Sequence, residues 1–200
     1  MYKRLGECYV KYNPNYWNRD IDCKESHNCY SYFLDDKHSK VCSMYKYEND
    51  EEKRKMMNAQ PGHYCGMTKF VNYKDTTCDS LISRVLCDNP NIKVVDKDTE
   101  CGKNYYKGVL FIDEGRMYHF YRQDDSGNWS HKDGGGEATN LDYSGNEIID
   151  VEKSDRRYNS EEGVRSYNKL CSYFCVPENS FMETESGRNN YSEGEMLWSS

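Results

Sequence analysis

The apolar residues of the chain follow two different periods, one typical of helices and the other of strands. Between residues 75 and 88 they recur at spacings of one, three and four positions, which predicts an amphipathic helix. Residues 105–113 contain an unbroken apolar run, which indicates a strand buried on both faces. The aromatic-rich segment 116–123 and the segment 128–132 follow, with turn residues between them. Together they predict three adjacent antiparallel strands.

The same patterns divide the chain into three parts. Residues 1–23 show no clear periodicity, and we interpret them as an extended N-terminal arm. Residues 24–176 hold the predicted helices and strands, which gives one α+β domain of a size that a single core supports. Within it, residues 147–150 are expected to form a short strand. Residues 177–200 are polar, and we expect a C-terminal tail that becomes ordered against a protein partner.

A helix is expected to begin at Cys29, because Ser26 or Asn28 can cap it. The helical pattern reaches about residue 47, and Asp35-Asp36 is a place where it can divide into two helices. A thiol in the first turn of a helix lies near the positive end of the backbone dipole, which lowers its pKa. Cys29 is therefore a candidate nucleophile.

Two histidines fall on the two arms of the predicted hairpin. If Arg122 faces Asn128 across the turn, His119 lies directly opposite His131, with the Cβ atoms about 5 Å apart. Their rings could then share one hydrogen bond. A cysteine at a helix start and a histidine on a strand are the residue types that act as nucleophile and base in covalent hydrolysis.

This order of residues resembles the papain-like cysteine peptidase superfamily, in its NlpC-type and CHAP-type branches. Cys29 is followed by Pro61-Gly62 and then by His119 and His131, and the resemblance covers about residues 24–135. It implies a papain-like α+β fold, in which the helix that carries the cysteine packs on a small antiparallel sheet. It also implies that Cys29 attacks an amide or ester carbonyl, that His119 transfers the proton, that His131 orients His119, and that Tyr16 supports the oxyanion.

The motif residues depart from that superfamily at several positions. Its members usually read D-C-S-G around the nucleophile, whereas this chain reads Asn28-Cys29-Tyr30-Ser31, and His63 replaces the aspartate expected after Pro-Gly. The same strings also resemble uncharacterised proteins of bacteria and large DNA viruses. The alternative hypothesis is therefore a catalytically inactive structural or interaction protein, for example a virion component, that uses the same fold.

Composition limits the classes of partner and compartment. The net charge of −7 excludes a general nucleic-acid binder and favours a neutral or cationic peptide or acyl substrate. No apolar run is long enough for a secretion signal or a membrane span, so the cytoplasm or a virion is the expected location. Aliphatic residues are scarce, and the 19 tyrosines are expected to fill much of the core.

The ten cysteines leave two alternatives open, free thiols in a reducing cytosol and disulfides in an oxidising compartment. A structural zinc site is disfavoured, because no C-x-x-C motif occurs and no histidine has the spacing of a zinc ligand. The missing C-x-x-C also disfavours a redox protein. The glycine-rich segment 134–136 lacks the residues of a phosphate-binding loop, so no metal and no cofactor is expected.

Overall fold

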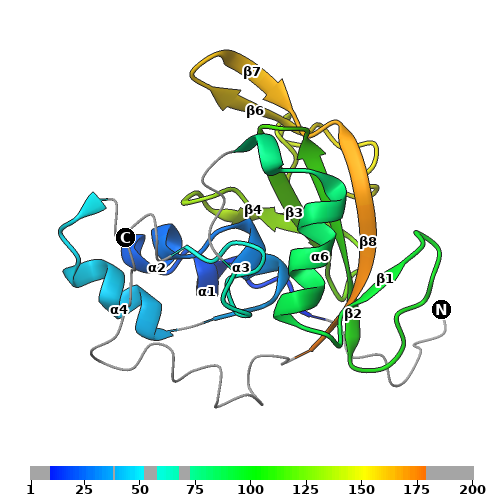
Figure 1. Ribbon diagram of the computed structural model, residues 1–200, viewed down its shortest axis with the longest axis horizontal. Coiled ribbons are helices and arrows are strands. Elements are labelled where there is room, and N and C mark those ends of the chain that lie inside the picture. Colours follow the sequence, from blue (N-terminus) through cyan, green and yellow to red (C-terminus); the bar gives the residue numbers. More distant parts are fainter. Residues whose placement is uncertain (1–9, 38, 52–57, 68–72, 179–200) are drawn as a thin grey trace.

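The chain folds into a six-stranded antiparallel sheet with short helices against one face (Figure 1). The computed structural model describes residues 10–37, 39–51, 58–67 and 73–178. This architecture confirms the expected α+β class. No helix among these residues is long and apolar enough to cross a membrane.

The helices come before the sheet in the sequence, and most are short. They are α1 (Pro14–Trp17), α2 (Ile21–Ser26), α3 (Cys29–Phe33), α4 (Ser39–Tyr47), the 3-10 helix η1 (Tyr73–Asp75) and α6 (Cys78–Asp88). Side chains cap three of them, since Asp20, Asn28 and Thr77 accept backbone N–H groups at the starts of α2, α3 and α6. The expected helix from Cys29 does divide into two, because α3 ends before Asp35, which has a left-handed φ of 52°.

The strands form one large sheet and one separate hairpin. They are β1 (Lys93–Val95), β2 (Tyr105–Asp113), β3 (Met117–Gln123), β4 (Trp129–Lys132), β5 (Ala138–Thr139), β6 (Arg157–Ser160), β7 (Gly163–Ser166) and β8 (Lys169–Pro177). The order in the sheet is β1-β8-β2-β3-β4-β5, so the last strand lies inside the sheet rather than at its edge. Within the described part of the chain, strands β6 and β7 pair only with each other, and they project from the body as a ribbon (Figure 1).

Alternation along the strands gives the sheet two apolar faces. On the helix face, Leu110, Phe120 and Phe174 pack with residues of α3 and α6. On the opposite face, Phe111 and Tyr121 pack with residues that come from the long connection between β4 and β8. Side chains two positions apart on a strand share a face, so neighbours such as Phe120 and Tyr121 belong to different cores.

Helix α3 approaches the sheet closely because β2 has a glycine at the contact. A Cβ atom at Gly108 would lie 2.7 Å from Cδ2 of Phe33, too close for a real contact. Phe33 fills this space and packs on Phe120, with ring centroids 4.6 Å apart. The hydroxyl of Tyr106 donates to the Phe33 carbonyl at 2.7 Å and satisfies an oxygen at the end of α3.

Two sequence predictions about secondary structure were wrong. The described part of residues 1–23 contains α1 and the start of α2, because Trp17 is buried against the Tyr32 ring and anchors the segment. Residues 147–150 form no strand, and only an isolated bridge joins Leu141 to Glu147. The amide of Ile148 donates to Asn140 instead, so this segment closes a loop. Most of the expected C-terminal tail lies outside the described residues.

Candidate functional site

Cys29 is the first residue of α3, as the sequence predicts, but its thiol is not activated. The side chain of Asn28 caps the helix by accepting the amides of Tyr30 and Ser31 at 3.0 and 3.1 Å. Cys29 itself is 6% exposed and packs in the core of the helix face. This burial raises the pKa of the thiol to about 12, because removal from water disfavours the thiolate more than the helix start favours it. The expectation of a lowered pKa was therefore wrong.

His119 on β3 and His131 on β4 form the predicted hydrogen-bonded pair. Nε2 of His119 lies 2.8 Å from Nδ1 of His131, and both side chains are buried. The register differs from the predicted one by two residues, because Tyr121 rather than His119 lies opposite His131. The centre of the hairpin turn lies one residue later than expected, since Gln123 pairs with Trp129. A shift of two keeps both rings on the same face, so their contact survives the error.

The hydrogen bonds fix the protonation of both rings. Nε2 of His131 lies 2.9 Å from the carbonyl oxygen of Leu141, which can only accept, so this nitrogen carries the proton. Neutral His131 then accepts at Nδ1, and His119 donates from Nε2. Burial lowers the pKa of His119 well below its usual value and also lowers that of His131. Both imidazoles are thus held neutral.

The structure brings the two histidines together, and it places Cys29 against the backbone of Phe120, the residue that follows His119. On β3, Phe120 and Arg122 contact α3, so His119, one position before Phe120, points to the opposite face of the sheet. There the His119 ring stacks on Tyr167, with centroids 5.0 Å apart. Among the described residues no hydrogen bond links Cys29 to either ring, and no three His, Cys, Asp or Glu side chains are placed to hold a metal ion.

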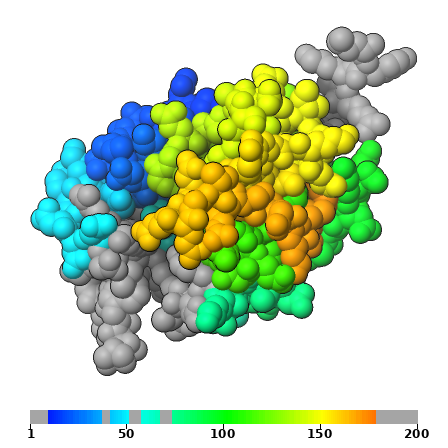
Figure 2. Space-filling view, turned by 90° about the horizontal axis from the view of Figure 1, so that it is seen from above, coloured from blue at the N-terminus to red at the C-terminus, as the bar shows by residue number. Residues whose placement is uncertain are grey.

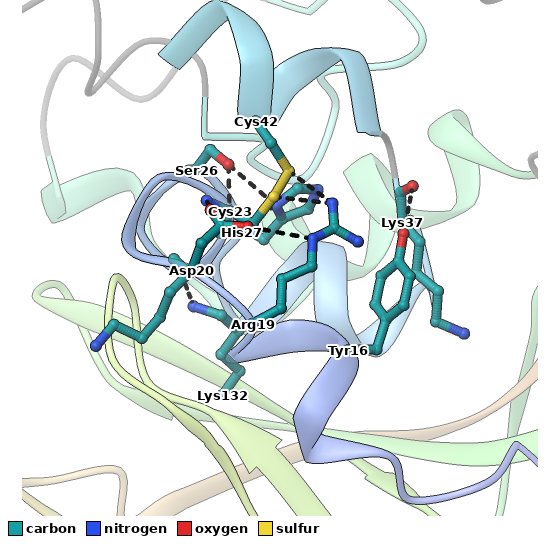
Figure 3. The surroundings of a disulfide bond; sticks show 10 residues. Tyr16, Arg19, Asp20, Cys23, Ser26, His27, Lys37, Cys42 and Lys132 are labelled. Carbon is teal, nitrogen blue, oxygen red and sulfur yellow. Dashed lines mark hydrogen bonds and ion pairs between the residues drawn. A yellow bond between two sulfur atoms is a disulfide. The ribbon is translucent and has the colours of Figure 1, made fainter. Parts of the chain in front are cut away.

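Tyr16, the predicted oxyanion support, makes its contacts elsewhere. Its hydroxyl donates to the carbonyl of Lys37 at 3.2 Å, and the guanidinium of Arg19 lies over its ring (Figure 3). The ring also packs edge-on against Trp17. These contacts give Tyr16 a role in joining α1 to the segment after α3.

Two buried cations were not predicted from the sequence. Arg122 and Lys132 both have no exposed surface and lie on the helix face of β3 and β4. Nζ of Lys132 donates to the carbonyl oxygen of Gly134 at 2.7 Å, and burial lowers its pKa to about 7. Alternation along the strands could have predicted the face on which these two residues lie, since each is one residue away from a position on the histidine face. No local feature of the sequence indicates that a charged side chain is buried there.

The cysteines are the feature that most changes the functional interpretation. Eight of the ten form four disulfides, Cys23–Cys42, Cys65–Cys87, Cys78–Cys171 and Cys101–Cys175. Cys29 is the free thiol within the described part of the chain, and Cys8 lies outside that part. Both cysteines that are four positions apart, Cys171 and Cys175, are oxidised, so neither is a thiolate ligand for zinc.

The disulfides join elements that also pack against each other or on the sheet. Cys23–Cys42 connects α2 to α4, and Nη2 of Arg19 lies 2.9 and 3.3 Å from its two sulfur atoms (Figure 3). Cys78–Cys171 fixes α6 to β8, the strand next to the edge strand β1. Short helices are unstable alone, so these bonds contribute directly to the fold.

Comparison with known proteins places the chain in a different class from the one its motifs suggest. No family model matches the chain, and no solved structure matches it. It is 31% identical over 150 residues to insoluble matrix shell protein 1 of Ruditapes philippinarum, a match that covers 74% of this chain and 83% of the relative.

This relative is named for a shell matrix and not for a hydrolase or a virus. The predictions of a thiol hydrolase of the peptidase or amidase type and of a viral protein were therefore wrong, and the alternative of a structural protein fits better. The catalytic roles predicted for Cys29, His119, His131 and Tyr16 were parts of that hydrolase reaction. By identity and coverage, the chain belongs to the same protein family as insoluble matrix shell protein 1.

Proposed function

We propose that this chain is a structural protein of an insoluble extracellular matrix and acts by binding other proteins, without catalysis. The observation that carries the proposal is the relationship to a shell matrix protein over most of both chains. Proteins that share a fold can differ in function, so the proposal also needs support from the molecule itself.

The disulfides supply the first independent support. Four disulfides in a chain of this size are typical of secreted proteins and rare in a reducing cytosol. They favour an oxidising compartment over the cytoplasm, which was one of the locations expected from the sequence. They also suit a protein that must last outside the cell, because cross-links limit unfolding and proteolysis.

The buried polar groups supply the second support. An activated cysteine needs a partly exposed, electropositive environment, whereas Cys29 is buried and its pKa is raised. Arg122, Lys132 and the histidine pair are likewise enclosed by protein and form hydrogen bonds within it. Such groups determine a unique packing rather than react with a substrate.

We also infer that the scaffold keeps the general arrangement of the papain-like superfamily. What supports this is that α3 begins at Cys29 and packs against β3 and β4, the strands that carry His119 and His131. An experimental structure whose strand order differs from β1-β8-β2-β3-β4-β5 would contradict this inference.

Fractionation of the source tissue tests the proposed function. An antibody against the folded domain would be applied to the soluble cell extract, the salt extract and the extracellular residue that denaturant alone does not dissolve. We expect the chain in the residue and not in either soluble extract. A soluble intracellular protein would contradict the proposal, and a known cytosolic protein followed on the same blots controls for contamination.

A further inference from the structure

One face of the sheet is covered by a single stretch of chain, residues 133–168, which we name the cover segment. It begins with β5, which pairs with β4 at the edge of the sheet, and continues through β6, β7 and the loops between them. It forms a continuous part of the surface, yellow-green to orange in Figure 2. Ile148 and Val151 of the cover segment pack on Phe111 and Trp129 of the sheet. The amide of Trp129 also donates to the carbonyl of Ile148 at 2.8 Å.

The histidine pair provides a polar anchor for this segment. His131 donates to the carbonyl of Leu141 at 2.9 Å, and His119 stacks on Tyr167. Leu141 and Tyr167 lie in the first and last thirds of the cover segment, while both histidines belong to the sheet. The pair therefore connects the two ends of the segment to the same point of the sheet.

Protonation of the rings opposes these contacts. A first added proton leaves the hydrogen bond between the rings in place, because neutral His119 can carry its hydrogen on Nδ1 and accept at Nε2 from His131, but with both rings protonated the two N–H groups would face each other and the bond would be lost. A proton added to His119 would place a charge on a side chain that is 1% exposed. In either case the closed arrangement loses free energy that the open arrangement, with hydrated rings, does not lose.

The groups around the pair do not supply a full compensating charge. The titratable and charged groups that face it are Tyr121 of β3, Asp133 after β4, and Asp142, Tyr143, Arg156 and Tyr167 of the cover segment. Asp133 and Asp142 act against the effect of burial on His131, but burial is the larger effect and the pKa is lowered.

We infer that His119 and His131 form an acid-sensitive latch, which holds the cover segment closed while both are neutral and releases it when they are protonated. Opening would uncover the apolar residues of the sheet beneath, among them Val109, Phe111 and Trp129. The inference does not depend on the proposed function, since it concerns the folded chain alone.

The size of the effect follows from proton linkage. A histidine in water has a pKa of about 6.5, so at pH 5 one histidine that is protonated only in the open state favours opening about 30-fold, and two favour it up to about 1000-fold. The carboxyl groups of Asp142 and Asp155 have pKa values lowered by hydrogen bonds from backbone amides and from Arg157 and Ser144, so they remain charged at this pH.

Hydrogen exchange of the full chain, with disulfides intact, tests the latch at pH 7.5 and 5.0. The informative amides are those of Tyr143, Ile148 and Tyr167, which donate to carbonyls within the cover segment. After correction for the intrinsic effect of pH, we expect faster exchange of these amides at pH 5.0, by up to about 1000-fold, with β2 and β8 unchanged. His131→Gln should reduce the change to about 30-fold, and His119→Gln with His131→Gln should abolish it.

His27 offers a matched control, because it is also buried and burial also lowers its pKa, but it lies at the end of α2. His27→Gln should keep the full acid response of the cover segment. The inference is overturned if the wild-type cover segment exchanges equally at both pH values, if β2 and β8 open with it, or if the double variant keeps the response. Should the double variant not fold, the comparison of cover segment and β2 in the wild type decides.

Discussion

Nη1 of Arg122 donates a hydrogen bond of 2.8 Å to Oδ1 of Asp35, and this pair joins β3 to the end of α3. The same guanidinium lies over the ring of Tyr32, 3.9 Å from its centroid, and donates to the carbonyl oxygens of Tyr32 and Lys11. One buried cation thus connects the sheet, a helix and the N-terminal segment. A buried charge is tolerable only when it is paired and hydrogen-bonded in this way.

Replacement of Arg122 should be among the most destabilising single changes in the chain. Arg122→Met removes the cation beside the buried Asp124 and leaves Asp35 with Lys37 as its remaining cation, so we expect a loss of about 3 to 5 kcal/mol in the free energy of unfolding. Arg116→Met is the matched control, because Arg116 pairs with Glu162 at the surface and its loss should cost less than about 1 kcal/mol. Equal losses in urea denaturation would contradict this account.

Asp124 should make stability depend on pH in a direction opposite to that of most carboxylates. Burial raises its pKa to about 6, against the opposing effects of Ser130 and Arg122. Between about pH 4 and 6 the folded chain therefore binds a proton that the unfolded chain lacks, and its stability falls as the pH rises. Asp124→Asn should gain stability relative to wild type from pH 4 to 7, by at most about 3 kcal/mol.

Urea denaturation of the wild type and of Asp124→Asn at pH 4 and at pH 7 measures this difference in the free energy of unfolding. Asp125→Asn, at the exposed neighbouring position, separates the effect of burial from the loss of one negative charge. A difference between Asp124→Asn and wild type that does not change with pH would show that Asp124 is ionised in the folded chain throughout.

Cys29 should be inert to thiol reagents in the folded protein. With its pKa raised to about 12, the thiolate is scarcer than in an unfolded chain by about 1000-fold or more near neutral pH, and burial also blocks access. Iodoacetamide at pH 7.5, followed by peptide mass spectrometry, should label Cys29 only after denaturant is added. Rapid labelling of the native chain would restore the argument for an activated nucleophile.

The four disulfides should differ in their contribution to stability. Cys78–Cys171 closes a loop of 93 residues and Cys23–Cys42 one of 19, for which loop entropy gives about 5 and about 3 kcal/mol. Paired Cys→Ala variants measure the two losses by denaturant unfolding without reductant. A larger loss for Cys23–Cys42 would show that local contacts, such as those with Arg19, outweigh chain entropy.

The strands and the histidine contact could be predicted because they depend on local periodicity. The predicted strand 105–113 has the bounds of β2, and the predicted helix at residues 75–88 contains α6. The hairpin register was wrong by two residues, yet His119 and His131 still meet, because an even shift preserves the face.

The relation of Cys29 to the histidines could not be predicted, because it depends on which face of the sheet receives α3. That choice is set by long-range contacts of Phe120 and Arg122 with α3, and by Gly108, whose missing side chain makes room for Phe33. Disulfide connectivity is likewise a tertiary property, since eight cysteines allow 105 pairings. The spacing of Cys, Pro-Gly and two histidines therefore does not by itself determine how Cys29 lies relative to the two rings.

The oxidation state of the native chain tests the central claim most directly. The protein would be recovered from the insoluble extracellular residue of its source, alkylated without reduction, digested and analysed by mass spectrometry. We predict peptides linked through Cys23–Cys42, Cys65–Cys87, Cys78–Cys171 and Cys101–Cys175, with Cys29 as an unlinked thiol. Recovery only from the soluble cell extract, with these eight cysteines alkylated as free thiols, would contradict a disulfide-bonded structural protein of the extracellular matrix.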